Sequence, residues 1–353
     1  MSGRIVPRLG PEQVGQRVVV RRRIGNGRVA DVLGELLSWD ADGDGTARIR
    51  SRHGEVVVPL ADVVAGKPVP PPPERRGAPH RAIGWEGLED VMVDGWRPLE
   101  LDWLGVRGQG WRLRAADGFT GRANSVLAVG DPGLPLEQAV DRAEQWYAER
   151  GLGARFALPW PLAERDSKLD ALLAERGYEV DTPTLVMSAA TRDVAAAVAQ
   201  PGGPGFSVGP SSGVPAGFEL HDAAEPDDGW LSVYHYRGQE LPPVARRLLL
   251  SAPEQVFVTV RGTDPPLDQV VAVGRGASSR GWTGVTAMEV VPAQRRRGLA
   301  TLVLGALAEW AMQRGDRSMY LQVAEQNRGA RGLYAGLGFA DHHGYHYRVA
   351  PPS

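Results

Sequence analysis

The chain has 353 residues, a length that predicts two or three domains, each able to bury a core of its own. Its 40 Lys and Arg and 42 Asp and Glu residues give a formal charge of −2, which excludes a uniformly basic nucleic-acid coat. The absence of cysteine excludes disulfides, cysteine zinc sites and a cysteine nucleophile. Residues 1–10 lack the apolar core of a signal peptide, and no stretch approaches the roughly 18–20 apolar residues of a membrane span. We therefore expect a cytoplasmic protein with no membrane partner and no metal site.

The first segment is rich in short β-type runs. They cover residues 16–23, 33–38, 47–51 and 55–59, with Gly- and Asp-rich turns between them. This pattern predicts a small, all-β, SH3-like barrel over residues 1–67. The run Arg21-Arg22-Arg23 leaves two interpretations open, a nucleic-acid contact or the solvated arginines of a strand edge.

Proline and glycine mark two boundaries further along the chain. Residues 68–80 form a proline-rich linker, stiff and extended. Residues 191–217 contain Gly, Pro and Ser in the proportions of a flexible linker. The remaining segments, 81–190 and 218–353, are the second and third predicted domains.

These two domains share an order of elements. In the last one, a helical run over 299–314 ends at Gly315, a strand covers 318–323, and a helix over 327–337 ends at Gly338. The middle domain repeats this order with a helix over 136–150 before Gly151, a strand over 154–158, and a helix over 166–176 before Gly177. Glycine after a helix is typical of a left-handed cap. We therefore expect two copies of one α/β unit.

An anion site is predicted where the strand over 285–291 stops at Pro292. An Arg/Gly-rich loop follows and leads directly into an apolar helix. The first N–H groups of a helix lack intrahelical partners, and the helix dipole adds positive charge there. The loop residues concerned are Arg295, Arg296, Arg297, Gly298, Leu299, Ala300 and Thr301.

Two motifs carry a resemblance to the GNAT N-acetyltransferase superfamily, over roughly residues 218–348. They are Arg295-x-x-Gly298-x-Ala300 and Asn327-x-x-Ala330-x-x-Leu333-Tyr334-x-x-x-Gly338-Phe339. The resemblance implies an α+β fold, a mixed splayed sheet flanked by helices, with acetyl-CoA as co-substrate in the splay. It implies that the loop amides of 295–301 hold the pyrophosphate. It also implies that backbone groups of Met288 and Val290 hold the pantetheine and thioester, that Asn327 contacts the pantetheine, and that Tyr334 lies near the sulfur.

The chemistry of acetyl transfer to an amine needs a proton donor for the leaving thiolate. Tyr334 is our candidate, because a tyrosine of pKa about 10 can protonate a thiolate whose thiol has a pKa of about 8.5. A core tyrosine on an amphipathic helix is the alternative. For the general base, Glu289 is the candidate on the strand, with Glu240, His235 or a water relay as alternatives. We expect Trp230, Tyr234, His235 and Tyr236 near the acceptor.

The middle domain departs from the first motif. Its loop at 129–135 contains Asp131, Pro132 and Pro135, and these repel a pyrophosphate or lack an N–H. We interpret residues 81–190 as a degenerate GNAT-like domain supporting the active one at 218–353. This tandem arrangement resembles mycothiol synthase. Residues 118–126 and the SH3-like domain more closely resemble an actinobacterial GNAT group that includes proteins labelled histone-acetyltransferase-like.

The sequence thus predicts an acetyl-CoA-dependent N-acetyltransferase that transfers acetyl directly to a primary amine of a small molecule or protein. The alternatives are a non-catalytic acyl-CoA sensor or scaffold, and a protein associated with nucleic acid through its first domain, whose segment 1–80 carries a net charge of +4. The acceptor and the oligomeric state are not determined by the sequence.

Overall fold

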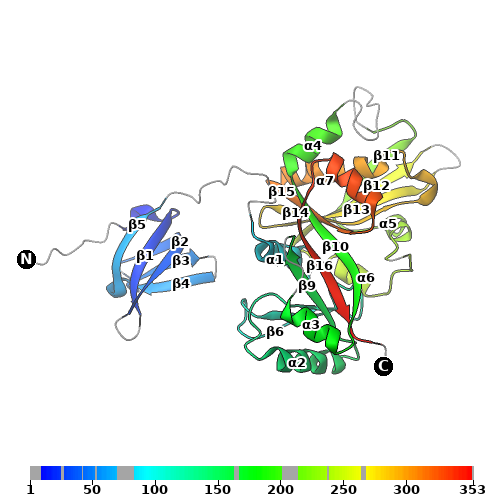
Figure 1. Ribbon diagram of the computed structural model, residues 1–353. Coiled ribbons are helices and arrows are strands. Elements are labelled where there is room, and N and C mark those ends of the chain that lie inside the picture. The colour runs from blue at the N-terminus through cyan, green and yellow to red at the C-terminus, as the bar shows by residue number, and fades with distance from the viewer. Residues whose placement is uncertain are drawn as a thin grey trace, which may run out of the picture. The chain divides into compact units, whose positions relative to one another are not determined.

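The computed structural model describes residues 9–24, 28–41, 43–51, 54–69, 83–162, 167–200, 214–236, 238–263 and 268–351. The chain forms two compact units, Met1–Arg76 and Gly77–Ser353 (Figure 1). None of the described helices is long and apolar enough to cross a membrane.

The first unit is a five-stranded antiparallel sheet in the order β4-β3-β2-β1-β5. Its elements are η1 (Pro11–Gln13), β1 (Arg17–Ile24), β2 (Arg28–Asp40), β3 (Thr46–Ser51), β4 (Gly54–Pro59), η3 (Leu60–Asp62) and β5 (Val63–Pro68). Side chains including Val18, Val20, Leu36 and Ile49 form its buried core. The all-β prediction is confirmed. In the described part of the unit, however, no pair of strands joins β4 to β5, so a closed SH3-like barrel is not observed.

Two details of this unit differ from the sequence prediction. The strand β5 was missed, because its Ala-Gly-Lys-Pro end lacks β-type residues; pairing with β1 determines its conformation. Since β1 therefore lies between β2 and β5, Arg21 is not on a strand edge. Its guanidinium pairs with both oxygens of the exposed Asp31 carboxylate, at 2.8 and 2.9 Å.

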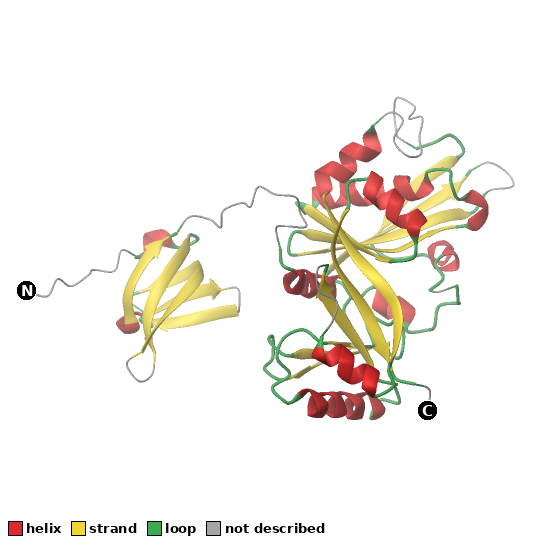
Figure 2. Cartoon of the chain, in the orientation of Figure 1, coloured by secondary structure: helices red, strands yellow, loops and turns green. Residues whose placement is uncertain are grey.

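The second unit contains one continuous sheet (Figure 2). Its first half comprises α1 (Trp85–Gly95), β6 (Glu100–Leu104), β7 (Trp111–Ala115), β8 (Val126–Leu127), α2 (Leu136–Ala148), β9 (Arg155–Pro161), α3 (Lys168–Glu175), β10 (Glu179–Ala190) and α4 (Thr191–Ala199). Its second half comprises β11 (Phe218–Ala223), α5 (Asp228–Val233), α6 (Ala245–Leu249), β12 (Glu254–Gly262), β13 (Val270–Ser279), β14 (Trp282–Val290), η5 (Pro292–Gln294), α7 (Leu299–Gln313), β15 (Ser318–Ala324), α8 (Arg328–Gly336) and β16 (Ala340–Val349).

The strand order of this sheet is symmetric about the β10–β16 pair, except that β11 has no counterpart in the first half. The order is β11-β12-β13-β14-β15-β10-β16-β9-β8-β7-β6. Each half contains one parallel pair with a helix between its strands, β8 with β9 around α2 and β14 with β15 around α7. Each half also lends its last strand to the other, because β10 pairs with β15 and β16 pairs with β9. The halves therefore share one sheet, and the boundary predicted at residue 190 falls inside a joint structure.

The element order predicted for the two halves is confirmed. Helices α2, α3, α7 and α8 and strands β9 and β15 lie in the predicted segments. The glycines at all four helix ends adopt positive φ: 66° at Gly151, 81° at Gly177, 78° at Gly315 and 91° at Gly338. Only glycine takes up this left-handed conformation without strain, so these caps could be located from sequence.

The predicted linker over 191–217 is wrong in its first part. Residues Thr191–Ala199 form α4, which packs on α7 through Val194 and Val198. A Cβ on Gly305 of α7 would lie 2.8 Å from Val198, so glycine allows this close packing. The Ala- and Val-rich composition is that of a helix with one apolar face. Residues 201–213, and 70–80 of the other linker, lie outside the described part of the chain.

One half-buried charge cluster links the exchanged strand β16 to the first half. The Asp170 carboxylate on α3 accepts hydrogen bonds from Arg348 at 2.8 and 3.2 Å and contacts His346 at 2.7 Å. Burial raises the pKa of Asp170, but the bonds from Arg348 and His346 outweigh it and hold that pKa below its usual value. The cluster thus stabilises the folded state above about pH 4, and this contribution is lost as pH falls through the lowered pKa.

We expect Asp170→Asn to lower the free energy of unfolding by about 2 kcal/mol at pH 7, because it leaves Arg348 without its counter-ion. Urea denaturation at pH 7 and pH 3 measures this, and the difference from wild type should shrink at pH 3. The control is Asp141→Asn, which removes the exposed partner of Arg176 and should cost under about 1 kcal/mol. Equal losses in the two variants would contradict the assignment.

Candidate active site

The parallel strands β14 and β15 separate part-way along their length. Their pairing ends at Val285 and Leu321. Beyond that point β14 continues against β13, and β15 continues against β10. A bulge opposite Gly274 leaves Ala287 at φ +52°. The edge of β14 facing the gap therefore has no strand partner from 286 to 290, and its peptide groups are available to a ligand.

The loop after β14 leads directly into the first turn of α7. Gly298 is the N-cap of α7 at φ +74°, and no side chain caps its first turn. Arg296, at φ +65°, has no ion-pair partner in the described residues. Leu299 and Thr301 are buried, Ala300 is half-buried, and the side chains of Arg295–Arg297 are exposed. An uncapped helix start beside exposed arginines has the chemistry of an anion site.

Glu289 and Arg295 form an ion pair at this loop. The Arg295 guanidinium lies 3.2 Å from the Glu289 carboxylate and also donates to the Val290 carbonyl at 3.1 Å. Glu289 lies on the side of β14 that faces Tyr234, whose pKa is raised by burial and further by the Glu289 charge. Met288 and Val290 pack on the opposite side, in the core beneath α7. The carboxylate is thus committed to the loop before any substrate arrives.

Tyr334 and Asn327 both lie on or beside α8. The Asn327 side chain accepts a hydrogen bond from the Ala330 N–H at 3.1 Å and caps the helix. Tyr334 packs edge-on to Phe339, with ring centres 6.0 Å apart, in the core that α7 covers. Its hydroxyl has no hydrogen-bond partner among the described residues, and burial raises its pKa to about 12. It is therefore a phenol that stays protonated.

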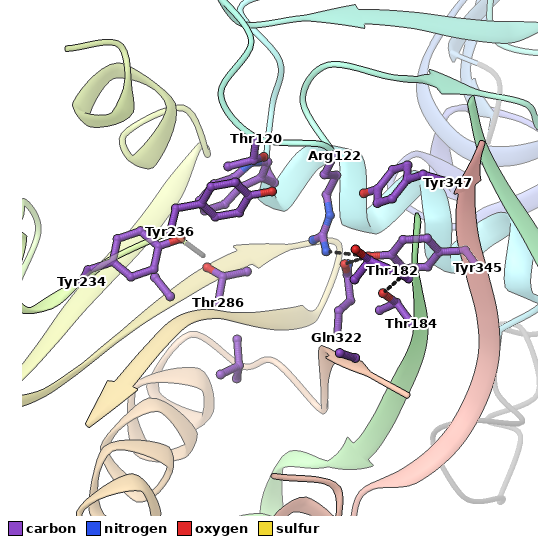
Figure 3. A pocket seen from close by; sticks show the side chains of 14 residues that line it. Thr120, Arg122, Thr182, Thr184, Tyr234, Tyr236, Thr286, Gln322, Tyr345 and Tyr347 are labelled. Atoms are coloured by element: carbon purple, nitrogen blue, oxygen red, sulfur yellow. Dashed lines mark hydrogen bonds between the residues drawn. The ribbon is translucent and has the colours of Figure 1, made fainter. Parts of the chain in front are cut away.

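A pocket of about 240 Å³ lies on the other face of the sheet, where the strands separate (Figure 3). Side chains alternate along a strand, so Gln322 and Thr184 face this pocket, while their neighbours Leu321 and Leu185 face α7. Two left-handed residues, Thr182 and Ala287, mark bulges in its walls. The remaining lining residues are Trp96, Thr120, Arg122, Tyr234, Tyr236, Val285, Thr286, Ala324, Tyr345 and Tyr347.

The middle segment contributes to this pocket in a way that the sequence did not indicate. Arg122 lies in the loop between β7 and β8, and it points between the Tyr234–Tyr236 pair and the Tyr345–Tyr347 pair (Figure 3). The Asn124 side chain fixes that loop, accepting from the N–H of Ala116 at 2.7 Å and of Gly118 at 2.9 Å. The only signal in the sequence was the Gly- and Asn-containing run at 118–126.

The residues predicted near the acceptor, with the alternative bases, fall into three groups. Tyr234 and Tyr236 line this pocket. Trp230 is wholly buried in the core. His235 and Glu240 are exposed and lie outside the described pocket lining, so the structure brings neither to the gap as a base.

The loop of the middle half that corresponds to 295–301 is arranged differently. The Asp131 carboxylate accepts the Gly133 N–H at 2.8 Å, and Pro135 precedes the first turn of α2. A carboxylate therefore occupies the position from which an amide would meet a phosphate, in agreement with the absence of the motif.

Comparison with known proteins identifies the family. The model described as "Probable histone acetyltransferase Rv0428c C-terminal" matches residues 85–348, and that described as "Rv0428c N-terminal Sm-like domain" matches residues 12–67. The chain belongs to the Rv0428c family. The Sm-like description replaces our SH3-like prediction for the first unit.

The relatives agree with this assignment. The chain is 30% identical to "Probable histone acetyltransferase Rv0428c" of Mycobacterium tuberculosis, over 96% of this chain and 95% of that protein. It is 27% identical to "Uncharacterized N-acetyltransferase YobR" of Bacillus subtilis, over 68% of this chain and 89% of that one. A GCN5-related N-acetyltransferase from Kribbella flavida shares the fold, with TM-score 0.53 and 17% identity, over 77% of this chain and 98% of that one. This member of the Rv0428c family is an acyltransferase with a GNAT-like α+β fold.

Proposed function

We propose that this acyltransferase moves an acetyl group from acetyl-CoA directly to a primary amine. The observation that carries the proposal is the separation of β14 from β15. The Arg/Gly loop and the start of α7 lie on one face of the sheet at this separation, and the pocket lies on the opposite face. A thioester entering from one side would meet an amine entering from the other. No covalent acetyl-enzyme on cysteine is possible, because the chain has none.

The residues present fit acetyl-CoA as co-substrate. The uncapped first turn of α7 and the exposed arginines 295–297 would hold the pyrophosphate, with Gly298 in a conformation that a side chain would strain. The unpaired edge of β14 at Met288 and Val290 would bind the pantetheine arm, and one of its N–H groups would stabilise the oxyanion. Asn327 would act mainly by capping α8 and so positioning Tyr334.

We assign Tyr334 as the acid that protonates the leaving thiolate, because its hydroxyl is otherwise unpartnered and remains protonated. Glu289, predicted as the base, is held by Arg295. We propose that it positions the phosphate-binding loop, and that the amine enters the pocket in its neutral form.

We further propose that the two halves are copies of one GNAT unit, of which the middle one no longer binds a nucleotide. The symmetric strand order and the matching glycine caps support this. The middle half then supplies strand β10 to the shared sheet and the loop with Arg122 to the wall of the pocket. The resemblance to mycothiol synthase remains a prediction, as does a nucleic-acid partner. Against the latter, Arg21, Arg48 and Arg50 of the first unit pair with acidic side chains.

The test is release of free thiol from acetyl-CoA by the full chain, with and without a panel of primary amines. We expect amine-dependent release with a kcat of about 1 per second or more, the lower end of typical enzyme values. Binding of acetyl-CoA without amine-dependent turnover would support the sensor alternative. No binding at millimolar acetyl-CoA would overturn the proposal.

A further inference from the structure

Two hydrogen-bond donors in the pocket have capacity left for a ligand. The Tyr345 hydroxyl donates to the Gln322 side-chain oxygen at 2.8 Å and accepts from Arg122 at 3.4 Å. The amide nitrogen of Gln322 is buried and has no partner. Arg122 makes no ion pair with any described residue, and its one side-chain hydrogen bond among them is to the Tyr345 hydroxyl. Because both donors meet at Tyr345, their free N–H groups lie close together in the pocket wall.

The pocket is cationic, although the whole chain is not. None of the described residues that line it is acidic. Burial lowers the pKa of Arg122, but Tyr345, Tyr347, Tyr320 and the buried Glu89 carboxylate outweigh this and keep the pKa above its usual value, so the guanidinium is charged. Glu89 is not among the residues that line the pocket, and its carboxylate lies 3.0 Å from the ring nitrogen of His343. Behind the wall, the fully buried Arg275 donates to Thr286 at 3.3 Å and lies 5.0 Å from the Trp96 ring centre.

Such a pocket discriminates between ligands by charge. A guanidinium presents a planar fork of N–H groups that matches a carboxylate, and burial strengthens the bond. A second positive charge in the pocket is unfavourable, so a bound ammonium loses its proton more readily than in water. This supplies the neutral amine that acetyl transfer requires without a carboxylate base.

We infer that the acceptor is a small amine that also carries a carboxylate, held by Arg122 and Gln322 while its amine faces the gap between β14 and β15. This rests on the proposed function. The volume of about 240 Å³ is below the roughly 300–1,000 Å³ of sites for drug-sized ligands, in agreement with a compact acceptor. A lysine-rich peptide, which brings several positive charges, is a poor match for the same pocket.

The experiment compares acceptors that differ by one charge. Full-length protein and saturating acetyl-CoA are mixed with amino acids, among them glycine, β-alanine, leucine and phenylalanine. Parallel reactions contain the primary amide of each, and a lysine-rich peptide with blocked ends. We expect at least one amino acid to exceed its own amide by tenfold or more in kcat/KM, and to exceed the peptide.

Three variants locate the effect. Arg122→Met should reduce the preference for the carboxylate to under threefold, mainly through KM of the acceptor. Tyr345→Phe, a milder change that removes the hydroxyl shared by both donors, should reduce it partially. Arg150→Met is the matched control, because Arg150 lies over Trp146 outside the pocket, and should leave the preference intact. Acetyl-CoA binding by each variant, measured by thermal shift, shows that it is folded.

Failure of this inference differs from failure of the proposed function. If the amides or the peptide are acetylated but no carboxylated amine is, or the amides and the peptide react as well as the acids, the inference is overturned and the acetyltransferase assignment stands. The same holds if folded Arg122→Met keeps the full preference. If wild type neither binds acetyl-CoA nor consumes it, the proposed function has failed as well.

Discussion

Tyr334→Phe should lower kcat about 100-fold and leave the KM for acetyl-CoA within about threefold of wild type. The substitution removes one hydroxyl from a side chain whose ring already packs against Phe339. General acid catalysis typically contributes 10²–10⁴-fold, and the loss falls on the chemical step rather than on binding. Initial rates of thiol release at varied acetyl-CoA measure both constants.

The matched control is Tyr178→Phe, which removes a half-buried hydroxyl that donates to Glu144 in the middle half, away from the splay. It should leave kcat unchanged within twofold. If Tyr334→Phe retains more than half of the wild-type kcat, Tyr334 is a core residue and the acid lies elsewhere.

The pH dependence of the rate provides a second test of Tyr334 as the proton donor. Burial raises the pKa of Tyr334 from 10 to about 12, so the donor form persists well above neutral pH and is lost only as pH approaches 12. Titration of Tyr334 should therefore cause no fall in the wild-type rate between pH 8 and 10. Any fall seen in that range should also be present in Tyr334→Phe. A fall that disappears in Tyr334→Phe would contradict the assignment.

Gly298→Asp should abolish the thermal stabilisation by acetyl-CoA. At about 100 times its Kd, a ligand stabilises the folded state by about 2.7 kcal/mol, which for a unit of this size raises Tm by roughly 5–10 °C. Aspartate at the N-cap of α7 places a negative charge where the pyrophosphate would bind. Differential scanning fluorimetry with and without acetyl-CoA measures the shift.

Gly298→Asn separates charge from backbone strain. Asparagine and aspartate are nearly equal in size, and both tolerate the left-handed conformation at φ +74° better than other side chains. The asparagine variant should therefore keep most of the stabilisation that the aspartate variant loses. Equal loss in both would mean that the bare glycine backbone matters rather than the charge. If the aspartate variant keeps the full rise in Tm with acetyl-CoA, the pyrophosphate does not bind at this loop.

Local signals in the sequence accounted for the elements and the motifs. The four glycines at helix ends could be predicted because a positive φ favours glycine in any tertiary context. The end of the strand at Pro292 could be predicted because proline has no N–H to donate to a sheet. The Arg/Gly loop could be located from the sequence because a strand, a loop and a helix start follow one another directly. The helix α4 was missed because its short apolar face is stabilised by packing on α7, which the local sequence does not reveal.

The composition and the order of residues by themselves determined a chain of small α/β units after a basic β unit, without cysteine chemistry, and they predicted an anion-binding turn at 295–301. The tertiary structure alone decided that the two halves exchange β10 and β16, and that Arg122, Gln322 and Tyr345, far apart in sequence, share one pocket. Strand partners and pocket walls depend on contacts between distant segments, and such contacts leave no periodic or local trace in the residues that make them.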